Sequence, residues 1–162
     1  GIWRNMGGCL APMNAYLNII GMETLGLRME RVCNNAFRLA QALEKLEGVS
    51  VNYPLLESSP YHELAEKQLS GKGGAILTIR AGSKERAYKL INHLKYVKIA
   101  TNIGDVRTLV IHPASTIYIH STPEAMAEAG VYDDTIRISV GIEDIKDLIQ
   151  DFTEAVESLG EE

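Results

Sequence analysis

Thr135-Ile136-Arg137-Ile138-Ser139-Val140 alternates apolar and polar side chains with a period of two, and Gly141 ends the run. This alternation predicts a β-strand with one buried face, because successive side chains of a strand point to opposite sides of its sheet. Ile136, Ile138 and Val140 form the apolar face. The strand therefore belongs to a sheet that is covered on one side.

The residues after this strand change to helical spacing. The apolar side chains that would share one helix face are Ile145, Leu148, Ile149, Phe152, Ala155, Val156 and Leu159. They predict an amphipathic helix over 142–159 that packs on the sheet. Glu143 and Asp144 fall in its expected first turn, where negative charge favours the positive end of the helix dipole.

Upstream of this pair, short alternating runs are interleaved with helical ones. The ranges expected as strands are 49–53, 75–80, 97–100 and 108–112, and those expected as helices are 61–69, 83–94 and a helix that starts near 121. Ser83 is placed to cap its helix, and Ser121 with Glu124 fits a capping box. These elements predict an α+β fold in which a mostly antiparallel sheet of four or five strands carries helices on one face, all in one domain spanning residues 1–162.

The chain opens with a long helical stretch. Pro12 is placed like a first helical residue, and no proline follows before Leu46. The seam of period 3.5 consists of Leu25, Met29, Val32, Ala36, Leu39, Leu43 and Leu46. One helix of ~35 residues would be about 50 Å long and would extend beyond its own domain toward a partner domain or subunit. A pair of shorter helices is the alternative, because Gly21 and Gly26 lie inside the stretch.

Charge, hydrophobicity and cysteine content limit the kinds of partner and location that the chain can have. The 162 residues carry a formal net charge of −5, which argues against nucleic acid or an anionic lipid surface as the main partner. No run reaches the roughly 18 apolar residues of a membrane span, and nothing resembles a signal peptide. Two cysteines are too few for a disulfide scaffold, which favours a reducing, cytoplasmic location. Because the first residue is Gly1 rather than Met, we expect a processed chain or a piece of a longer one.

Familiar catalytic motifs are not found in the sequence. None of the four histidines has a second ligand at helical spacing, so we expect no metal site. The glycine-rich run 71–74 lacks the spacing of a phosphate-binding loop and precedes a strand, so it is interpreted as a turn. A G-x-S-x-G nucleophile elbow is also missing.

Arg137 is the strongest candidate for binding. Strand alternation places it with Thr135 and Ser139 on the face opposite the core. The planar fork of an arginine matches the two oxygens of a carboxylate. A solvated sheet face is the alternative interpretation, and Asn102-Ile103-Gly104-Asp105 need be no more than a turn.

Several segments together resemble one family, and they follow its order and spacing across nearly the whole chain. The segments are Gly8–Ala15, Gly21-Met22-Glu23-Thr24-Leu25, Leu27–Arg31, Asn52-Tyr53-Pro54, His62–Ala65, Asn102-Ile103-Gly104-Asp105, His112–Thr116 and Ile136–Glu143. They are similar to the C-terminal domain of the transsulfuration enzymes, which use pyridoxal phosphate (PLP) in cysteine and methionine metabolism. The variants at 21–25 and 102–105 look most like the O-acetylhomoserine sulfhydrylase branch.

The resemblance implies specific roles for two residues. The family's Arg-x-Ser-x-Gly motif binds the α-carboxylate of a sulfur amino-acid substrate through its arginine, which is Arg137 here. The residue that opens the 102–105 segment lies beside the same carboxylate, and here it is Asn102. A fold type I PLP enzyme of this kind also implies a homo-oligomer.

Departures from the family limit what the resemblance implies. The family's cofactor-bearing lysine follows a Ser-x-Thr context in a large N-terminal domain, and none of the eight lysines has that context. We therefore expect the large PLP-binding domain to be absent from this chain, no PLP to be covalently bound and no turnover by the chain alone. At 117–120 the chain also departs from the family's usual Thr-His continuation, so no role is assigned to His120.

Three functional hypotheses remain open. The first is a domain of a PLP-dependent O-acetylhomoserine sulfhydrylase that makes homocysteine with sulfide, with methionine γ-lyase and the cystathionine enzymes as alternatives within the family. The second is a stand-alone module, without catalysis, for amino-acid binding or assembly. The third is an unrelated ferredoxin-like regulatory domain, which requires the matched segments to be coincidental.

Overall fold

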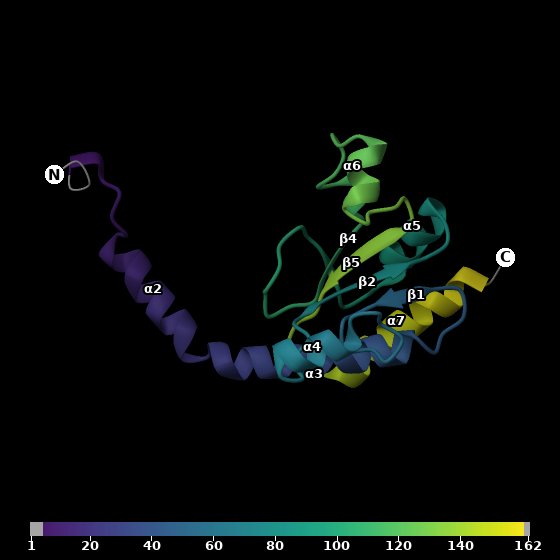
Figure 1. Ribbon diagram of the computed structural model, residues 1–162, viewed down its shortest axis with the longest axis horizontal. Helices are drawn as coiled ribbons and strands as arrows, with labels where there is room; N and C mark the ends of the chain where they lie inside the picture. Colours follow the sequence, from purple (N-terminus) through teal and green to yellow (C-terminus); the bar gives the residue numbers. More distant parts are fainter. Residues whose placement is uncertain (1–4, 161–162) are drawn as a thin grey trace.

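The computed structural model describes residues 5–160 and contains one five-stranded sheet with the strand order β1-β2-β5-β4-β3 (Figure 1). The strands are β1 (Ser50–Asn52), β2 (Ile76–Arg80), β3 (Lys98–Ile99), β4 (Leu109–Ile111) and β5 (Thr135–Ser139). Every neighbouring pair is antiparallel except β3 and β4, which run parallel. The predicted α+β fold with a mostly antiparallel sheet is confirmed.

The central strand is β5, the element from which the fold was predicted. It pairs with β2 through Thr78 opposite Arg137, and with β4 through Ile111 opposite the same arginine. Ile136 and Ile138 are fully buried on the other face. The alternation in the sequence therefore predicted correctly which side of β5 enters the core.

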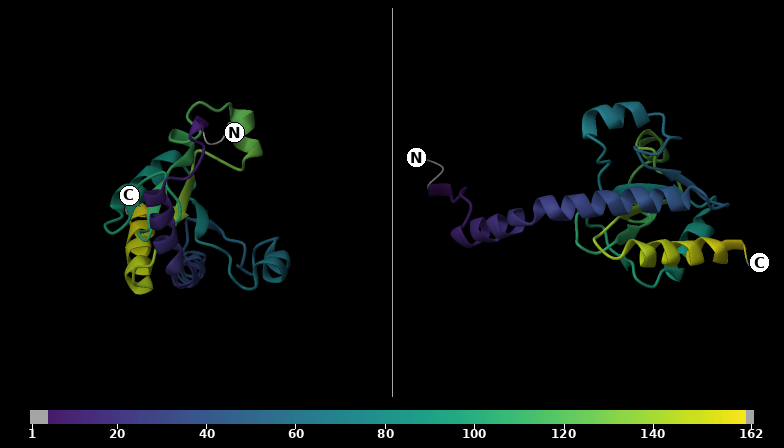
Figure 2. Two further views of the ribbon diagram at one scale, coloured as in Figure 1. Left: turned by 90° about the vertical axis from the view of Figure 1, so that its left-hand side faces the viewer. Right: turned by 90° about the horizontal axis from the view of Figure 1, so that it is seen from below.

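Helices cover that apolar face. α3 (Leu25–Leu43) and α7 (Ile145–Glu157) lie side by side beneath the sheet, and α5 (Lys84–His93) packs beside α7 (Figure 2). The seam residues Val32, Ala36, Leu39 and Leu43 of α3 are buried in this core. The later part of the chain also forms α4 (His62–Leu69), α6 (Pro123–Glu128) and the 3-10 turns η1 (Pro113–Ser115) and η2 (Ser158–Gly160).

The leading stretch is two helices and not one. α2 (Pro12–Glu23) ends at Glu23, because the backbone leaves helical geometry at Thr24. α3 ends at Leu43, short of the expected Leu46. The Arg28 side chain stabilises the break, because its Nη2 donates to the Gly21 carbonyl at 2.5 Å. The alternative of a broken pair is confirmed. Glycines near the junction weaken a continuous helix by about 1 kcal/mol each relative to alanine.

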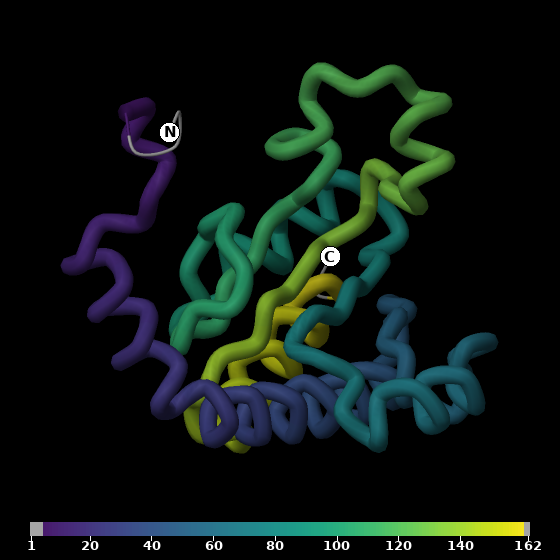
Figure 3. The backbone as a smooth tube through the Cα atoms, turned by 60° about the vertical axis from the view of Figure 1, so that its left-hand side comes forward, coloured from purple at the N-terminus to yellow at the C-terminus, as the bar shows by residue number. Residues whose placement is uncertain are grey.

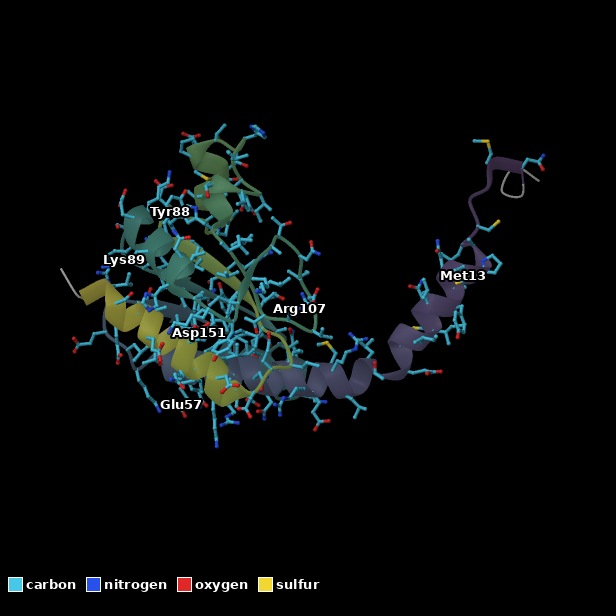
Figure 4. All side chains as sticks on the ribbon, turned by 180° about the vertical axis from the view of Figure 1, so that it is seen from behind. Met13, Glu57, Tyr88, Lys89, Arg107 and Asp151 are labelled. Atoms are coloured by element: carbon cyan, nitrogen blue, oxygen red, sulfur yellow. The ribbon has the colours of Figure 1, made fainter. Side chains whose placement is uncertain are left out.

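α2 projects away from the rest of the fold as an arm, which Met13 marks in Figure 4. None of its residues is buried. The large apolar side chains of the arm are between 43% and 66% exposed, and they are Met13, Tyr16, Leu17, Ile19, Ile20 and Met22. The prediction that the leading helical stretch extends beyond its own core is thus confirmed for α2.

Three helix starts test the predicted caps. Ser83 caps α5 as predicted, since its Oγ accepts the N–H of Arg86 at 3.2 Å. The cap of α6 is Thr122 and not Ser121, because Pro123 occupies the first helical position and leaves Thr122 at the capping position. α7 begins at Ile145 with Asp144 as its cap, three residues later than predicted. Glu143 therefore lies outside the helix.

Candidate functional site

The candidate site lies on the face of the sheet opposite the helices, where Arg137 meets the connection between β3 and β4, residues 100–108. Thr135 and Ser139 share this face of β5 and are buried, whereas Arg137 is half-buried. Figure 3 shows this connection running beside β5. Nη2 of Arg137 donates to the carbonyl of Thr101 at 2.6 Å and to that of Asn102 at 3.3 Å. The two residues predicted for the site, Arg137 and Asn102, are thus brought together, with Asn102 contributing its backbone oxygen.

The guanidinium of Arg137 is only partly used by the protein. Its Nε is the one buried side-chain nitrogen or oxygen that has no hydrogen-bond partner within residues 5–160. The two ion pairs found in that range, Arg80 with Asp134 and Lys95 with Glu154, do not involve Arg137. Carbonyl oxygens orient the group without neutralising it, so a half-buried positive charge is left without a counter-charge.

Arg86 shows what a structural arginine looks like in the same fold. Its Nε donates to Ala81, its Nη1 to Leu159 and its Nη2 to Gly48, so each of the three nitrogens has a backbone partner. Arg137 uses only Nη2. The contrast sets Arg137 apart as an arginine whose hydrogen-bond donors are not all used by the protein.

His112 is a structural residue. Its Nε2 lies 2.6 Å from the carbonyl of Asp133, which can only accept, so Nε2 carries the proton. Nδ1 then accepts from the backbone N–H and the hydroxyl of Ser115, at 3.2 and 2.8 Å, at the start of η1. Both ring nitrogens are occupied, which leaves none to bind a metal or to move a proton. Within residues 5–160 no three histidine, cysteine or acidic side chains are grouped to hold a metal ion.

Sequence reasoning missed the residues that hold the connection in place. Ser139, Thr108 and Glu143 form side-chain hydrogen bonds that join it to β5 and to the turn after β5. The placement of Ser139 on the same strand face as Arg137 was the only signal of this in the sequence. Thr108 and Glu143 are 35 residues apart, and their contact depends on the tertiary fold.

Comparison with known proteins identifies the family to which this sheet and its covering helices belong. The family model described as "Cys/Met metabolism PLP-dependent enzyme" matches residues 2–157, so the chain belongs to this family. Homocysteine synthase from Schizosaccharomyces pombe is 46% identical over 95% of this chain and 36% of its own length. O-acetyl-L-homoserine sulfhydrylase 1 from Thermus thermophilus is 43% identical over 94% of this chain and 37% of its own length.

A solved structure confirms the fold. The crystal structure of an O-acetylhomoserine (thiol)-lyase from Campylobacter jejuni superposes with a TM-score of 0.89 at 37% identity, over 95% of this chain and 37% of the other. The chain therefore spans little more than a third of the length of the proteins that it matches. The predicted family resemblance is confirmed.

The described residues do not form a site for PLP. All eight lysines lie exposed on the surface, whereas a cofactor-bearing lysine needs an enclosing pocket. Lys45 lines two surface cavities, but Glu47 and Glu157 share one of them and Glu44, Glu57 and Glu66 share the other. These carboxylates offset the positive charge of Lys45, and of Arg86 in the first cavity, that a phosphate group would need. No reaction step through PLP is therefore assigned to residues of this chain.

No helix within residues 5–160 has both the length and the apolar character required to cross a bilayer.

Proposed function

We propose that this chain is the substrate-side, C-terminal part of a PLP-dependent enzyme that makes homocysteine from O-acetyl-L-homoserine and sulfide. Arg137 holds the α-carboxylate of the amino-acid substrate in this proposal, and Asn102 lies beside it. The observation that carries the proposal is the partly unused guanidinium on the central strand. The names of the two relatives described above support the choice of substrate.

The charge balance explains why a carboxylate is the ligand. Arg137 offers planar, parallel donors and a positive charge that no acidic side chain neutralises within residues 5–160. A carboxylate accepts two such donors at once and supplies the missing charge. Held at this end, the amino acid is fixed in orientation, so that the bond to be broken can be placed against the cofactor. PLP, when bound elsewhere in the enzyme, supplies the electron sink for that chemistry.

The α2 arm supports the part of the proposal that makes this chain one portion of a larger enzyme. An isolated helix with apolar side chains on all sides gains by burying them, at about 25 cal/mol per Å². We assign the arm to the interface with the large PLP-binding part of the enzyme or with a second subunit. Substituting Leu17→Lys together with Ile20→Lys should lower the yield of assembled holoenzyme. Glu23→Lys, at the end of the same helix, is the control for added charge.

The kinetic test uses the complete enzyme that contains this chain, assayed for homocysteine from O-acetyl-L-homoserine and sulfide. Arg137→Ala should raise the KM for the amino acid and lower kcat/KM by at least ~10-fold, because a hydrogen bond to a charged group contributes about 1.5–3 kcal/mol. Arg137→Lys should recover only part of the loss, since an ammonium cannot bind two oxygens in a planar fork.

Arg80→Ala is the matched control. Arg80 lies on the same face of the same sheet, but its charge is neutralised by Asp134 at 2.8 Å. This variant should lose stability and keep its KM. Equal kinetics for Arg137→Ala and the unmodified enzyme would refute the carboxylate role. Release of methanethiol from L-methionine, without homocysteine synthesis, would move the enzyme to the methionine γ-lyase branch.

A further inference from the structure

The connection between β3 and β4 is exposed from residue 101 to residue 107, yet it is fastened along one edge. The N–H of Gly104 donates to Oγ of Ser139 at 3.2 Å. Further along, the N–H of Ile142 donates to the carbonyl of Val106 at 2.9 Å. The residue numbers rise together in the two segments, from 104 to 106 in the connection and from 139 to 142 after β5. The connection therefore runs alongside the end of β5 and the turn that follows it, in the same direction. Its conformation depends on that edge, because the other side faces solvent.

Glu143 holds the end of the connection that leads into β4. One oxygen of its carboxylate accepts the N–H of Thr108 at 2.5 Å, and the other accepts the Thr108 hydroxyl at 2.8 Å. The same hydroxyl accepts the N–H of Gly141 at 3.0 Å. Thr108 is 0% exposed, so these bonds are shielded from competing water. The carboxylate thereby fixes the point at which the connection enters β4.

The turn that carries Glu143 is itself held by the core. Nδ2 of Asn35, a buried residue of α3, donates to the carbonyl of Gly141 at 3.0 Å and to that of Glu143 at 2.9 Å. Gly141 packs so tightly that a Cβ atom there would lie 2.6 Å from the carbonyl carbon of Arg107. The turn at residues 141–143 is therefore rigid. Because Glu143 bonds to Thr108 from this turn, the end of the connection is held in a fixed position.

We infer that Glu143 and Thr108 are positioning residues for Arg137. The carbonyls of Thr101 and Asn102 set the direction of the guanidinium, and they belong to the connection that the Glu143–Thr108 pair holds in place. Without the pair, the connection samples other conformations. The guanidinium of Arg137 then has the orientation that binds the substrate carboxylate for only part of the time. The inference rests on the proposed function, since it concerns the carboxylate that Arg137 would bind.

The test compares Glu143→Ala and Thr108→Val in the complete holoenzyme. If the correct conformation is populated for about a tenth to a third of the time, the KM for O-acetyl-L-homoserine rises by about 3- to 10-fold. We expect kcat to change by less than about 2-fold and the KM for sulfide to stay constant, because only binding of the carboxylate is affected. Thr108→Ser keeps the hydroxyl and should restore the original KM.

Asp144→Ala is the structural control. Asp144 is the neighbouring carboxylate, and its side chain caps α7 by accepting the N–H of Lys146 at 2.8 Å and makes no hydrogen bond to residues 100–108. It should lower the melting temperature and leave the KM for the amino acid unchanged. A shift in KM that merely follows lost stability would appear in this variant too, and would overturn the inference.

The double variant Arg137→Ala with Glu143→Ala separates the two claims. If Glu143 acts through Arg137, its removal should have no further effect on KM once Arg137 is gone. An undiminished effect in that background overturns the positioning role while leaving the function intact. The positioning role is equally overturned if Arg137→Ala raises KM and Glu143→Ala does not. If Arg137→Ala itself leaves KM unchanged, both the function and the inference are wrong.

Discussion

The ring of Tyr53 packs on Gly73 so closely that a Cβ atom at Gly73 would lie 2.7 Å from the phenol oxygen. The Tyr53 hydroxyl continues past this glycine and donates to the carbonyl of Gly74 at 2.9 Å. Tyr53 is among the largest fully buried side chains of the core. The loop before β2 is therefore closed by a contact that tolerates no side chain.

Gly73→Ala should destabilise the fold by about 1–3 kcal/mol, the usual cost of forcing a methyl group into a packed core. Chemical denaturation followed by circular dichroism measures the loss. Gly21→Ala is the control, since nothing lies within 4 Å of a Cβ atom there and the residue is helical. That variant should be neutral or slightly more stable, and a similar loss for both would contradict the packing argument.

Tyr53 should also make the fold sensitive to alkali. Burial, and to a smaller extent the nearby Cys33 thiol, raises the pKa of Tyr53 well above its usual value of 10.0. Below pH 10 the phenol is protonated in both states and its contribution to stability is complete. Above pH 10 the unfolded chain loses this proton and the folded chain keeps it, so stability falls by up to about 1.4 kcal/mol per pH unit.

Thermal unfolding between pH 8 and pH 11.5 measures this loss. Tyr53→Phe should be less stable at pH 8, where it lacks the hydrogen bond to Gly74, and should approach the unmodified chain as the pH rises. Tyr96→Phe removes an exposed phenol and serves as the control. If the stability of Tyr53→Phe fell with pH as steeply as that of the unmodified chain, the buried phenol would not be the cause of the loss of stability in alkali.

Asp151 stabilises the segment that leaves α5. Its buried carboxylate accepts the N–H of Lys95 at 2.9 Å and that of Tyr96 at 3.1 Å, and it is labelled on α7 in Figure 4. Asp151→Ala should cost about 1–3 kcal/mol, because two backbone donors are left without their partner. Glu154→Gln removes only the exposed ion pair with Lys95 and should leave the melting temperature almost unchanged. Equal losses in the two variants would argue against a special role for the buried carboxylate.

The chain alone should not retain PLP. Incubation with PLP, reduction with borohydride and measurement of the intact mass should give the unmodified chain, because all eight lysines are exposed and none is enclosed by a pocket. Free lysine-rich peptide at equal concentration controls for nonspecific labelling. A single stoichiometric adduct on one lysine would mean that this chain holds its own cofactor and that the proposed division of the enzyme is wrong.

Local patterns in the sequence predicted most of the fold, because they depend on near neighbours. The alternation around Arg137 placed Ile136 and Ile138 in the core, and the position of Ser83 located the start of α5. The break at Thr24 was available only as an alternative, since glycines lower helix stability without deciding where a helix ends.

The site was predicted less completely than the fold. Arg137 and Asn102 were named from strand alternation and family motifs, and the structure places them in contact. The support from Thr108 and Glu143 could not be predicted, because it joins residues 35 positions apart in the chain. Glu143 was assigned to the wrong local environment, a helix turn, since the delayed start of α7 depends on how Asp144 caps it.

The two halves of the site should differ in their hydrogen exchange. Arg137 stands on the strand that is paired on both sides, so its amide neighbours should exchange only when the whole domain opens. The carbonyls that face it belong to residues 101 and 102, which are exposed and open locally. Binding of an amino-acid substrate should therefore slow amide hydrogen exchange across residues 101–107 and leave the exchange of β5 unchanged.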